Sequence, residues 1–161
     1  MNYEPRLIVL CGLPGTGKST DTGMMRESGW HIYSTDDYLE KICARDGTNY
    51  DDVFAEYIKH ATEHMNRYLQ HAIREGQNVL WDQTNLTLRK RRGILARFPS
   101  TYYTECWYYP VTERHYSEWK HRLANRNGKT IPERVLNNMI STMETPTDGE
   151  GFDRLLIKET F

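Results

Sequence analysis

The stretch CGLPGTGKST, from Cys11 to Thr20, constrains this chain more than any other. It directly follows the apolar run Leu7–Leu10, which has the pattern of a strand buried on both faces of a parallel sheet. A glycine-rich loop between such a strand and a helix lets successive backbone N–H groups point at phosphate oxygens, and the helix adds its positive end. The spacing G-x-x-x-x-G-K-S fits this loop, so the sequence predicts a nucleoside triphosphate site.

Residue types in the loop match the tasks of a phosphate site. Lys18 is expected to bridge the β- and γ-phosphates, and the Ser19 hydroxyl is expected to ligate Mg²⁺. A glycine-rich turn without a ligand is the alternative, and the match over the whole motif argues against it. We expect ATP as the nucleotide and Mg²⁺ as the metal. The residues predicted to bind the nucleotide here are Gly12, Leu13, Pro14, Gly15, Thr16, Gly17, Lys18, Ser19 and Thr20.

Length and composition predict one compact domain, residues 1–161, because the chain has 161 residues, 38% of them hydrophobic and 27% charged. The chain has no apolar run near the roughly 18 residues that span a bilayer, and its start lacks the features of a signal peptide. We therefore expect a cytoplasmic protein with no membrane partner. Three scattered cysteines predict neither a disulfide framework nor a zinc site, and His60 and His64 lack a third ligand.

Hydrophobic periodicity predicts alternating strands and helices, the signature of an α/β fold. We expect a mostly parallel sheet covered by helices on both faces. Strands are expected near 7–10, 30–34, 78–81, 102–109 and 155–157, and helices near 19–28, 36–45, 51–75, 87–98, 112–126 and 132–143.

Two carboxylates, Asp36 and Asp37, follow the second expected strand. In a doubly wound sheet this position lies at the carboxyl edge, beside the first loop, where ligands bind. A carboxylate there is suited to accept the proton of an attacking hydroxyl and to help hold the metal. We predict that Asp36 has these roles, with Asp37 near the substrate. Helix capping is the alternative for both.

Polar residues also close the third expected strand, in the segment DQTN. Asp82, Thr84 and Asn85 are predicted to contact the acceptor, the metal shell or the Asp36 carboxylate. Local turn formation is the alternative, because Asp and Asn form turns readily.

Arg122 and Arg126 are four residues apart on an expected helix, near the breakable segment ANRNGK. We predict that they bind the triphosphate from a small helical lid around 122–132, where they would neutralise charge during phosphate transfer. A solvated basic face is the alternative.

The ordered motifs GLPGTGKST, STDDY, DQTN, NRNGKTIP and EGFDRLLI resemble those of the polynucleotide 5′-hydroxyl kinase family, especially the bacteriophage T4-type kinase domain, within the P-loop kinases. The resemblance covers nearly the whole chain and implies a P-loop kinase fold. It also implies that Asp36 is the general base, that Lys18 and Ser19 hold phosphate and metal, and that Arg126 stabilises the transferring phosphoryl group. A phage-encoded protein of this kind would act in the host cytoplasm.

Two departures limit the resemblance. The T4-type enzyme has an arginine after the DDY triplet that meets the acceptor strand, and this chain has Leu39 there. End recognition is therefore expected to differ. The phosphatase domain of that enzyme is also absent, so we expect no processing of 3′ ends.

The acceptor is the open question. Our leading hypothesis is a hydroxyl of DNA or RNA, by default the 5′-hydroxyl end. The cluster Arg89, Lys90, Arg91, Arg92 and Arg97 is a candidate phosphate contact, because a net charge of −1 requires a local basic patch. A solvated face is the alternative for this cluster, and sheet core is the alternative for the aromatic run 102–109.

Three other activities compete with this hypothesis. Some phage kinases of this type phosphorylate 5-hydroxymethyluracil within DNA, and the loss of an end-reading arginine suits such an acceptor. Small-molecule kinases, for nucleosides, nucleotides or the sugar nucleotides of zeta-toxin-like enzymes, share the same loop. A nucleotide-binding switch without phosphate transfer is the last alternative.

Overall fold

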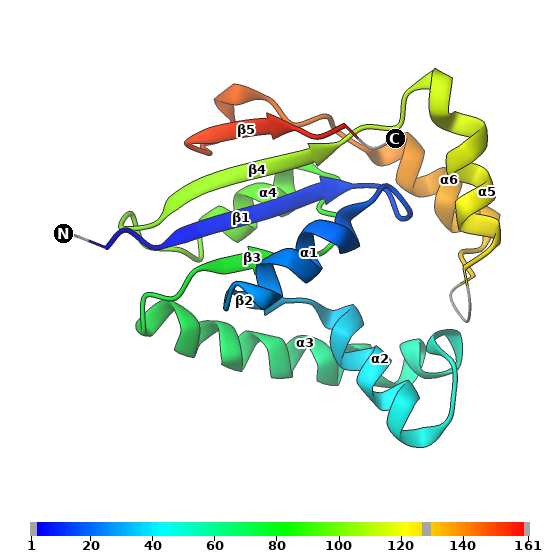
Figure 1. Ribbon diagram of the computed structural model, residues 1–161, viewed down its shortest axis with the longest axis horizontal. Helices are drawn as coiled ribbons and strands as arrows, with labels where there is room; N and C mark the ends of the chain where they lie inside the picture. The colour runs from blue at the N-terminus through cyan, green and yellow to red at the C-terminus, as the bar shows by residue number, and fades with distance from the viewer. Residues whose placement is uncertain (1–2, 127–129, 160–161) are drawn as a thin grey trace.

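The computed structural model describes residues 3–126 and 130–159. Its strands form one five-stranded sheet in the order β2-β3-β1-β4-β5, and every strand pair in it is parallel (Figure 1). The strands are β1 (Arg6–Gly12), β2 (His31–Tyr33), β3 (Val79–Trp81), β4 (Tyr103–Tyr109) and β5 (Arg154–Ile157). The helices are α1 (Lys18–Glu27), α2 (Thr35–Asp46), α3 (Tyr50–Arg74), α4 (Leu88–Leu95), η1 (Glu113–His115), α5 (Tyr116–Ala124), α6 (Glu133–Thr142) and η2 (Asp148–Glu150). The predicted α/β fold is confirmed.

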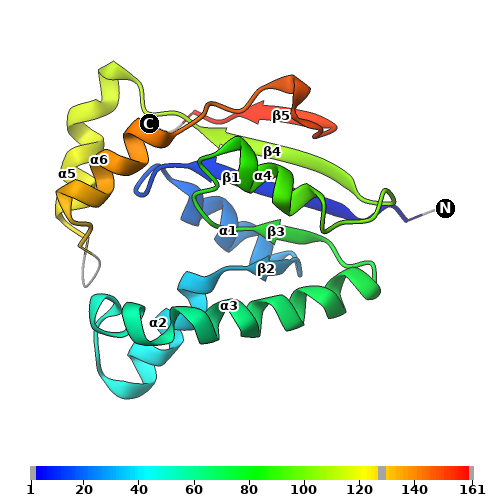
Figure 2. The same cartoon turned by 180° about the vertical axis from the view of Figure 1, so that it is seen from behind.

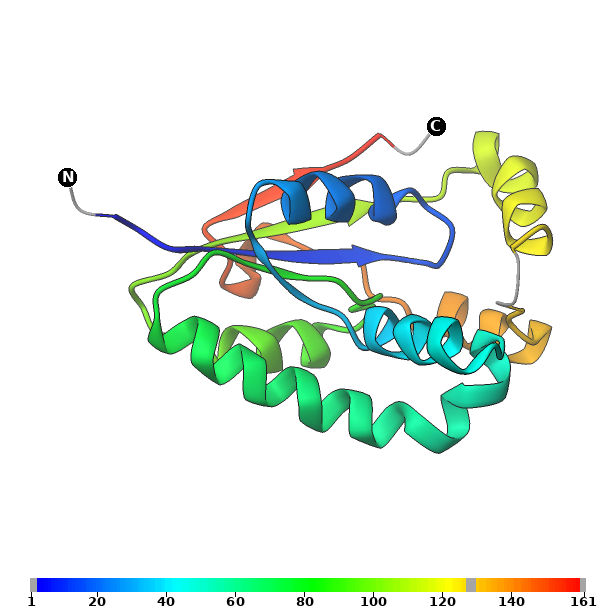
Figure 3. The same cartoon turned by 60° about the horizontal axis from the view of Figure 1, so that its bottom comes forward.

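Helices cover both faces of the sheet, as the alternation predicted. On one face, Val9 of β1 packs in a cluster with Leu69 of α3 and Ile94 of α4. On the other face, Ile8 belongs to a cluster against which Met25 of α1 packs. Figure 3 shows α1 on one side of the sheet and α3 and α4 on the other. The fully buried β1 strand is therefore the centre of the core.

Strand β1 lies between β3 and β4 in the sheet. The connection from β1 leads to β2 on one side of it, and the connection from β3 leads to β4 on the other side. In open parallel sheets, ligands bind outside the carboxyl ends of the strands at such a switch point. Helices α5 and α6 lie beyond the same end of the sheet (Figure 2). The fold thus brings the first loop, the end of β3 and the α5–α6 segment together.

Helix α2 begins and ends at clear signals. The Ser34 hydroxyl accepts a hydrogen bond from the Asp37 backbone N–H at 3.2 Å, which caps the helix, and Gly47 ends it with φ of 68°. Leu39 and Ile42 then pack against Val53 and Ala61 of α3. The side chain of Leu39 is 0% exposed, so its position belongs to the contact between two helices.

The prediction of one helix over 112–126 was wrong in its bounds. A short η1 precedes α5, and α5 ends at Ala124, so Arg126 lies beyond the helix that carries Arg122. The two arginines do not share one helical face, because the helix stops before the second. Residues 127–129 of the expected lid lie outside the described residues.

Both interpretations of the basic cluster were wrong for Arg91, whose side chain is 0% exposed. Its guanidinium donates to both carboxylate oxygens of Glu150, at 2.8 and 2.7 Å, and to the Asn85 carbonyl at 3.0 Å. The periodicity of α4 turns this residue toward the core, where Glu150 neutralises its charge. Arg89, Lys90, Arg92 and Arg97 are exposed, as expected for a solvated face.

Other local expectations had mixed outcomes. The aromatic strand β4 is mainly core, because Trp107 and Tyr109 are buried. Cys11 and Cys106 are buried, whereas Cys43 is partly exposed. No helix in residues 3–126 and 130–159 is long and apolar enough to cross a membrane.

The Arg91–Glu150 pair gives a prediction about stability. Arg91→Ala should lower the free energy of unfolding by about 3–5 kcal/mol, because Glu150 loses the partner of a buried charge. Urea denaturation followed by circular dichroism measures this change.

The neighbouring Arg92 is exposed, so Arg92→Ala is the matched control and should change the free energy of unfolding by about 0.5 kcal/mol or less. The double variant Arg91→Met/Glu150→Leu should lose less than Arg91→Ala, since it leaves no unpaired buried charge. Equal losses in Arg91→Ala and Arg92→Ala would contradict the role of this pair.

Candidate active site

In the loop between β1 and α1, the backbone conformation or the closeness of neighbouring atoms requires glycine at three positions. Gly15 and Gly17 have φ of 77° and 97°, a conformation that other residues rarely adopt. A Cβ on Gly12 would lie 3.0 Å from the Cβ of Tyr109, so β4 approaches the start of the loop too closely for a side chain. The loop and the helix that begins at Lys18 therefore have the strand–loop–helix arrangement that the motif predicted.

Lys18 lies within this loop, and its Nζ donates to the carbonyls of Gly12 and Leu13, each at 2.8 Å. Burial lowers the pKa of Lys18 to about 8, and the nearby Asp82 carboxylate opposes this shift. Asp36 also raises the pKa of Lys18, whereas the positive charge of Arg126 lowers it. The fold has thus gathered three residues from other segments around one ammonium group.

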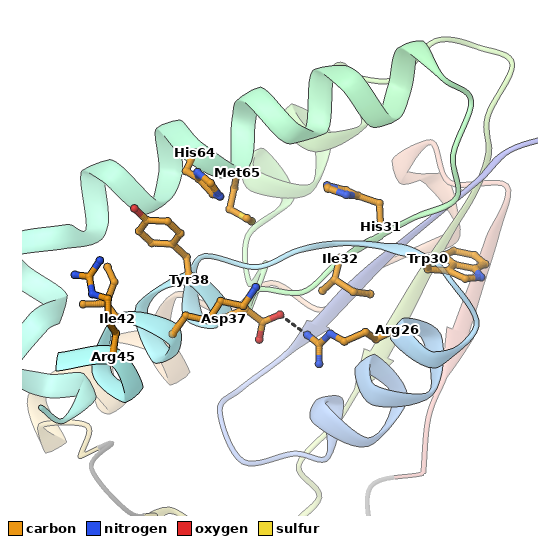
Figure 4. Close-up of a pocket in the computed structure, with 11 residues that line it drawn as sticks. Arg26, Trp30, His31, Ile32, Asp37, Tyr38, Ile42, Arg45, His64 and Met65 are labelled. Carbon is orange, nitrogen blue, oxygen red and sulfur yellow. Dashed lines mark hydrogen bonds and ion pairs between the residues drawn. The ribbon is translucent and has the colours of Figure 1, made fainter. Parts of the chain in front are cut away.

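Asp36 and Asp37 have different partners although they are consecutive. An oxygen of Asp36 accepts a hydrogen bond from the Tyr50 hydroxyl at the start of α3. Asp37 forms an ion pair with Arg26 near the end of α1 (Figure 4). Capping of α2 falls to Ser34, so neither carboxylate side chain serves as the cap.

Tyr50 is a site residue that the sequence interpretation missed. Burial raises its pKa, and the hydrogen bond and charge of Asp36 raise it further, so Tyr50 is a hydrogen-bond donor to that carboxylate. The positive charge of Arg126 lowers the pKa of Tyr50, so Arg126 acts on Tyr50 as well as on Lys18. No local motif marks this tyrosine, because its role depends on how α3 packs against α2.

Three residues of the DQTN segment have different surroundings and contacts. Asp82 ends β3 beside Lys18; burial raises the pKa of Asp82, while the Lys18 charge and a hydrogen bond from Thr22 lower it. Thr84 contributes its carbonyl, which accepts from the Gly12 N–H at 3.0 Å. Asn85 is 2% exposed, with φ of 48°. The turn alternative fits Asn85, whereas Asp82 faces the loop.

Helix α5 packs directly on the phosphate-binding loop. The indole N–H of Trp119 donates to the Pro14 carbonyl at 2.7 Å, and Trp119 is 0% exposed. A Cβ on Gly15 would lie 3.0 Å from the side chain of Leu123, so the helix leaves no space there. Arg122 lies one residue before Leu123 and pairs with Glu118 at 3.2 Å. Leu123, near the start of the segment expected to form a lid, thus packs against the loop.

The far end of that segment contacts α3. Asp51 accepts hydrogen bonds from the backbone N–H and the hydroxyl of Thr130, at 3.0 and 2.5 Å. These bonds lower the pKa of Asp51. The adjacent residues Tyr50 and Asp51 therefore contact Asp36 on one side and Thr130 on the other.

The oxygen donors near the loop fit Mg²⁺. Ser19 is exposed at the start of α1, and the carboxylates of Asp36 and Asp82 act on Lys18 from α2 and β3. Hydroxyl and carboxylate oxygens are hard ligands, and Mg²⁺ takes only one or two protein carboxylates when it also binds phosphate. These residues would hold the metal, which supplies charge neutralisation to the phosphates.

A strand, a glycine loop with a half-buried lysine, and a helix define a P-loop nucleotide-binding protein. The chain belongs to the AAA domain family, whose sequence profile matches residues 7–146.

Solved structures share the fold. A chain of the Pnkp1/Rnl/Hen1 RNA repair complex matches with a TM-score of 0.66 and 19% sequence identity, over 88% of this chain and 45% of that one. A sugar kinase from Janibacter sp. matches with a TM-score of 0.63 and 17% sequence identity, over 97% of this chain and 86% of that one. A fungal RNA kinase matches with a TM-score of 0.61 and 14% sequence identity, over 99% of this chain and 77% of that one. The chain therefore has the fold of P-loop kinases.

The low pKa of Lys18 predicts proton uptake when ATP binds. At pH 8.5 most Lys18 is neutral in the free protein, and the negative charge of the phosphates raises its pKa in the complex. ATP affinity should then fall as the pH rises above about 8, by up to about tenfold per pH unit. Isothermal titration calorimetry in two buffers of different ionisation enthalpy measures the proton uptake directly.

Lys18→Met should abolish this uptake, and Lys59→Met, at an exposed position on α3, should retain it. Identical binding enthalpies for the unmodified protein in both buffers at pH 8.5 would contradict the prediction.

Proposed function

We propose that this protein is an ATP-dependent kinase that transfers the γ-phosphate to a hydroxyl of nucleic acid, with the 5′-hydroxyl end of DNA or RNA as the leading acceptor. The observation that carries the proposal is that Lys18, which donates to the Gly12 and Leu13 carbonyls of the glycine loop, is subject to the charges of Asp36, Asp82 and Arg126. Phosphoryl transfer needs little beyond positioning and stabilisation of charge, together with a base near the nucleophile. Each of these requirements has a named residue.

Asp36 is the proposed general base. Its carboxylate takes the proton of the acceptor hydroxyl while the hydroxyl oxygen bonds to the γ-phosphorus. The bond from the γ-phosphorus to the β–γ bridging oxygen breaks, and ADP leaves with that oxygen. Tyr50 holds one oxygen of Asp36, which leaves the other available to the hydroxyl. Lys18 and Arg126 stabilise the negative charge that develops on the phosphoryl oxygens.

A nucleic acid acceptor is supported by two independent sources. The ordered motif set resembles the polynucleotide 5′-hydroxyl kinases, and two proteins with this fold are titled as RNA kinase and RNA repair complex. The fold also occurs in a sugar kinase, so a small-molecule acceptor is the main alternative.

The burial of Leu39 favours a second candidate within the same chemistry. This position, where the T4-type enzyme has its strand-contacting arginine, is 0% exposed between α2 and α3. The Leu39 side chain of this chain is therefore directed into the contact between the two helices rather than toward solvent. A hydroxyl inside a strand, as on 5-hydroxymethyluracil, needs no end-reading group, although the base must leave the stack.

Substitution of the proposed base separates catalysis from binding. Asp36→Asn should lower the turnover number by about 100-fold or more while ATP affinity stays within about threefold, because the amide keeps the shape but takes no proton. Lys18→Ala should abolish transfer through the loss of its phosphate contacts. Initial rates with labelled ATP and calorimetric ATP titrations provide both quantities.

Glu63→Gln is the matched control, because Glu63 is an exposed carboxylate on α3, and its rate should equal that of the unmodified protein. Transfer by Asp36→Asn at the normal rate would exclude Asp36 as the base. ATP binding without any transfer, in the unmodified protein, would favour a nucleotide switch.

An acceptor panel with γ-labelled ATP tests the substrate. The panel contains DNA and RNA oligonucleotides with 5′-hydroxyl or 5′-phosphate ends, duplex DNA with 5-hydroxymethyluracil, and free nucleosides and sugars. We expect label only where a 5′-hydroxyl end is present. Label on the 5′-phosphorylated modified duplex would move the acceptor to the base, and label on small molecules alone would refute a nucleic acid substrate.

A further inference from the structure

A pocket of about 430 Å³ lies beside β2, which is the edge strand of the sheet. Residues of α1, β2, α2 and α3 line it (Figure 4). We call this pocket the β2 groove. It is separate from the phosphate-binding loop, because no residue of that loop lines it.

Positive charge is concentrated in the β2 groove. Arg26, Lys41 and Arg45 line it, and Asp37 is the one lining carboxylate. Asp37 is already neutralised by its ion pair with Arg26. Lys41 forms no ion pair with the residues that the structure describes, and Arg45 pairs with Asp46 at an exposed position, where such pairs are weak. The chain as a whole carries −1, so the local charge is a property of this groove.

Flat and apolar side chains accompany these charges. Tyr38 lines the groove and packs against His64 with ring centroids 4.7 Å apart. Ile32 and Met65 add apolar surface to the lining of the groove. A ligand that matches this lining has negative charge and a flat ring, which is the chemistry of nucleotides.

Helix α2 carries residues of both the candidate active site and the β2 groove. Asp36 acts on Lys18, whereas the next residue, Asp37, lines the groove. Asp37, Lys41 and Arg45 then follow at four-residue spacing, so they share one face of α2 over roughly 12 Å. The two cations, Lys41 and Arg45, therefore lie one and two turns of α2 beyond Asp37, a spacing suited to contacts with successive phosphates.

We propose that the β2 groove binds a single-stranded segment of nucleic acid that continues from the acceptor hydroxyl. Lys41 and Arg45 contact backbone phosphates, and Tyr38 offers its ring to a base. This inference rests on the proposed function, because it takes the acceptor to be a polynucleotide. It assigns strand binding to α2 rather than to the basic helix α4.

Binding of 5′-hydroxyl 12-nucleotide DNA and RNA strands tests the groove without catalysis. Fluorescence anisotropy in the absence of ATP gives the affinity from 50 to 200 mM salt. Lys41→Gln/Arg45→Gln should weaken binding by about tenfold or more at low salt. It should also reduce the slope of log affinity against log salt by about 1.4, since each single-strand phosphate contact contributes about 0.7.

The matched control is Lys59→Gln/Arg74→Gln, which removes the same charge from exposed positions of α3 outside the groove. We expect it to bind as the unmodified protein does. Equal affinities and salt slopes in the two double variants would overturn the inference. Competition by a free mononucleotide as strong as by the 12-nucleotide strand would also overturn it, because the site would then read one nucleotide rather than a strand.

Transfer kinetics separate this inference from the proposed function. Lys41→Gln/Arg45→Gln should raise the KM for the 12-nucleotide acceptor about tenfold, with kcat and the KM for ATP within twofold. The KM for a dinucleotide acceptor should not change, because a dinucleotide is too short to reach both cations. If the unmodified protein phosphorylates neither acceptor, the proposed function fails, and the anisotropy measurement still decides whether the groove binds a strand.

Discussion

The buried guanidinium of Arg91 connects parts of the chain on which the position of the active loop depends. It bonds to Glu150, which is 59 residues away, and to the carbonyl of Asn85. Asn85 in turn donates from Nδ2 to the carbonyl of Leu10 at 2.6 Å, at the end of the central strand. A charge in a dry interior must be fully hydrogen-bonded, so this arrangement permits little variation in the distance between β1 and the DQTN segment.

The same constraint determines where the charged residues of the site lie. The Gly12 N–H bonds to the Thr84 carbonyl, which holds the end of β3 against the start of the loop. Asp82 therefore lies beside Lys18, where its charge opposes the loss of the lysine proton that burial favours. A lysine in this balance responds strongly to added negative charge, which is the property that a phosphate site requires.

Residues with local signals could be predicted from the sequence. The glycine spacing placed Lys18 in its loop, and the rule that parallel strands end at one edge brought Asp36 and Asp82 toward it. Residues whose roles depend on distant packing could not. Tyr50 meets Asp36 across 14 residues and a helix–helix contact, and Arg91 looked like one of several surface cations. The pattern of residues along the sequence does not show which residue of a distant segment will contact a given side chain.

Helix α2 presents different faces to three surroundings: Asp36 to the active site, Leu39 to α3, and Lys41 to water and the β2 groove. This arrangement limits how relatives of this chain can diverge. An arginine introduced at position 39 would enter a closed helix–helix contact and leave a charge without water or a partner. In this chain the exposed faces of α2 are the ones free to carry contacts with a substrate, while the buried face keeps the helix in place.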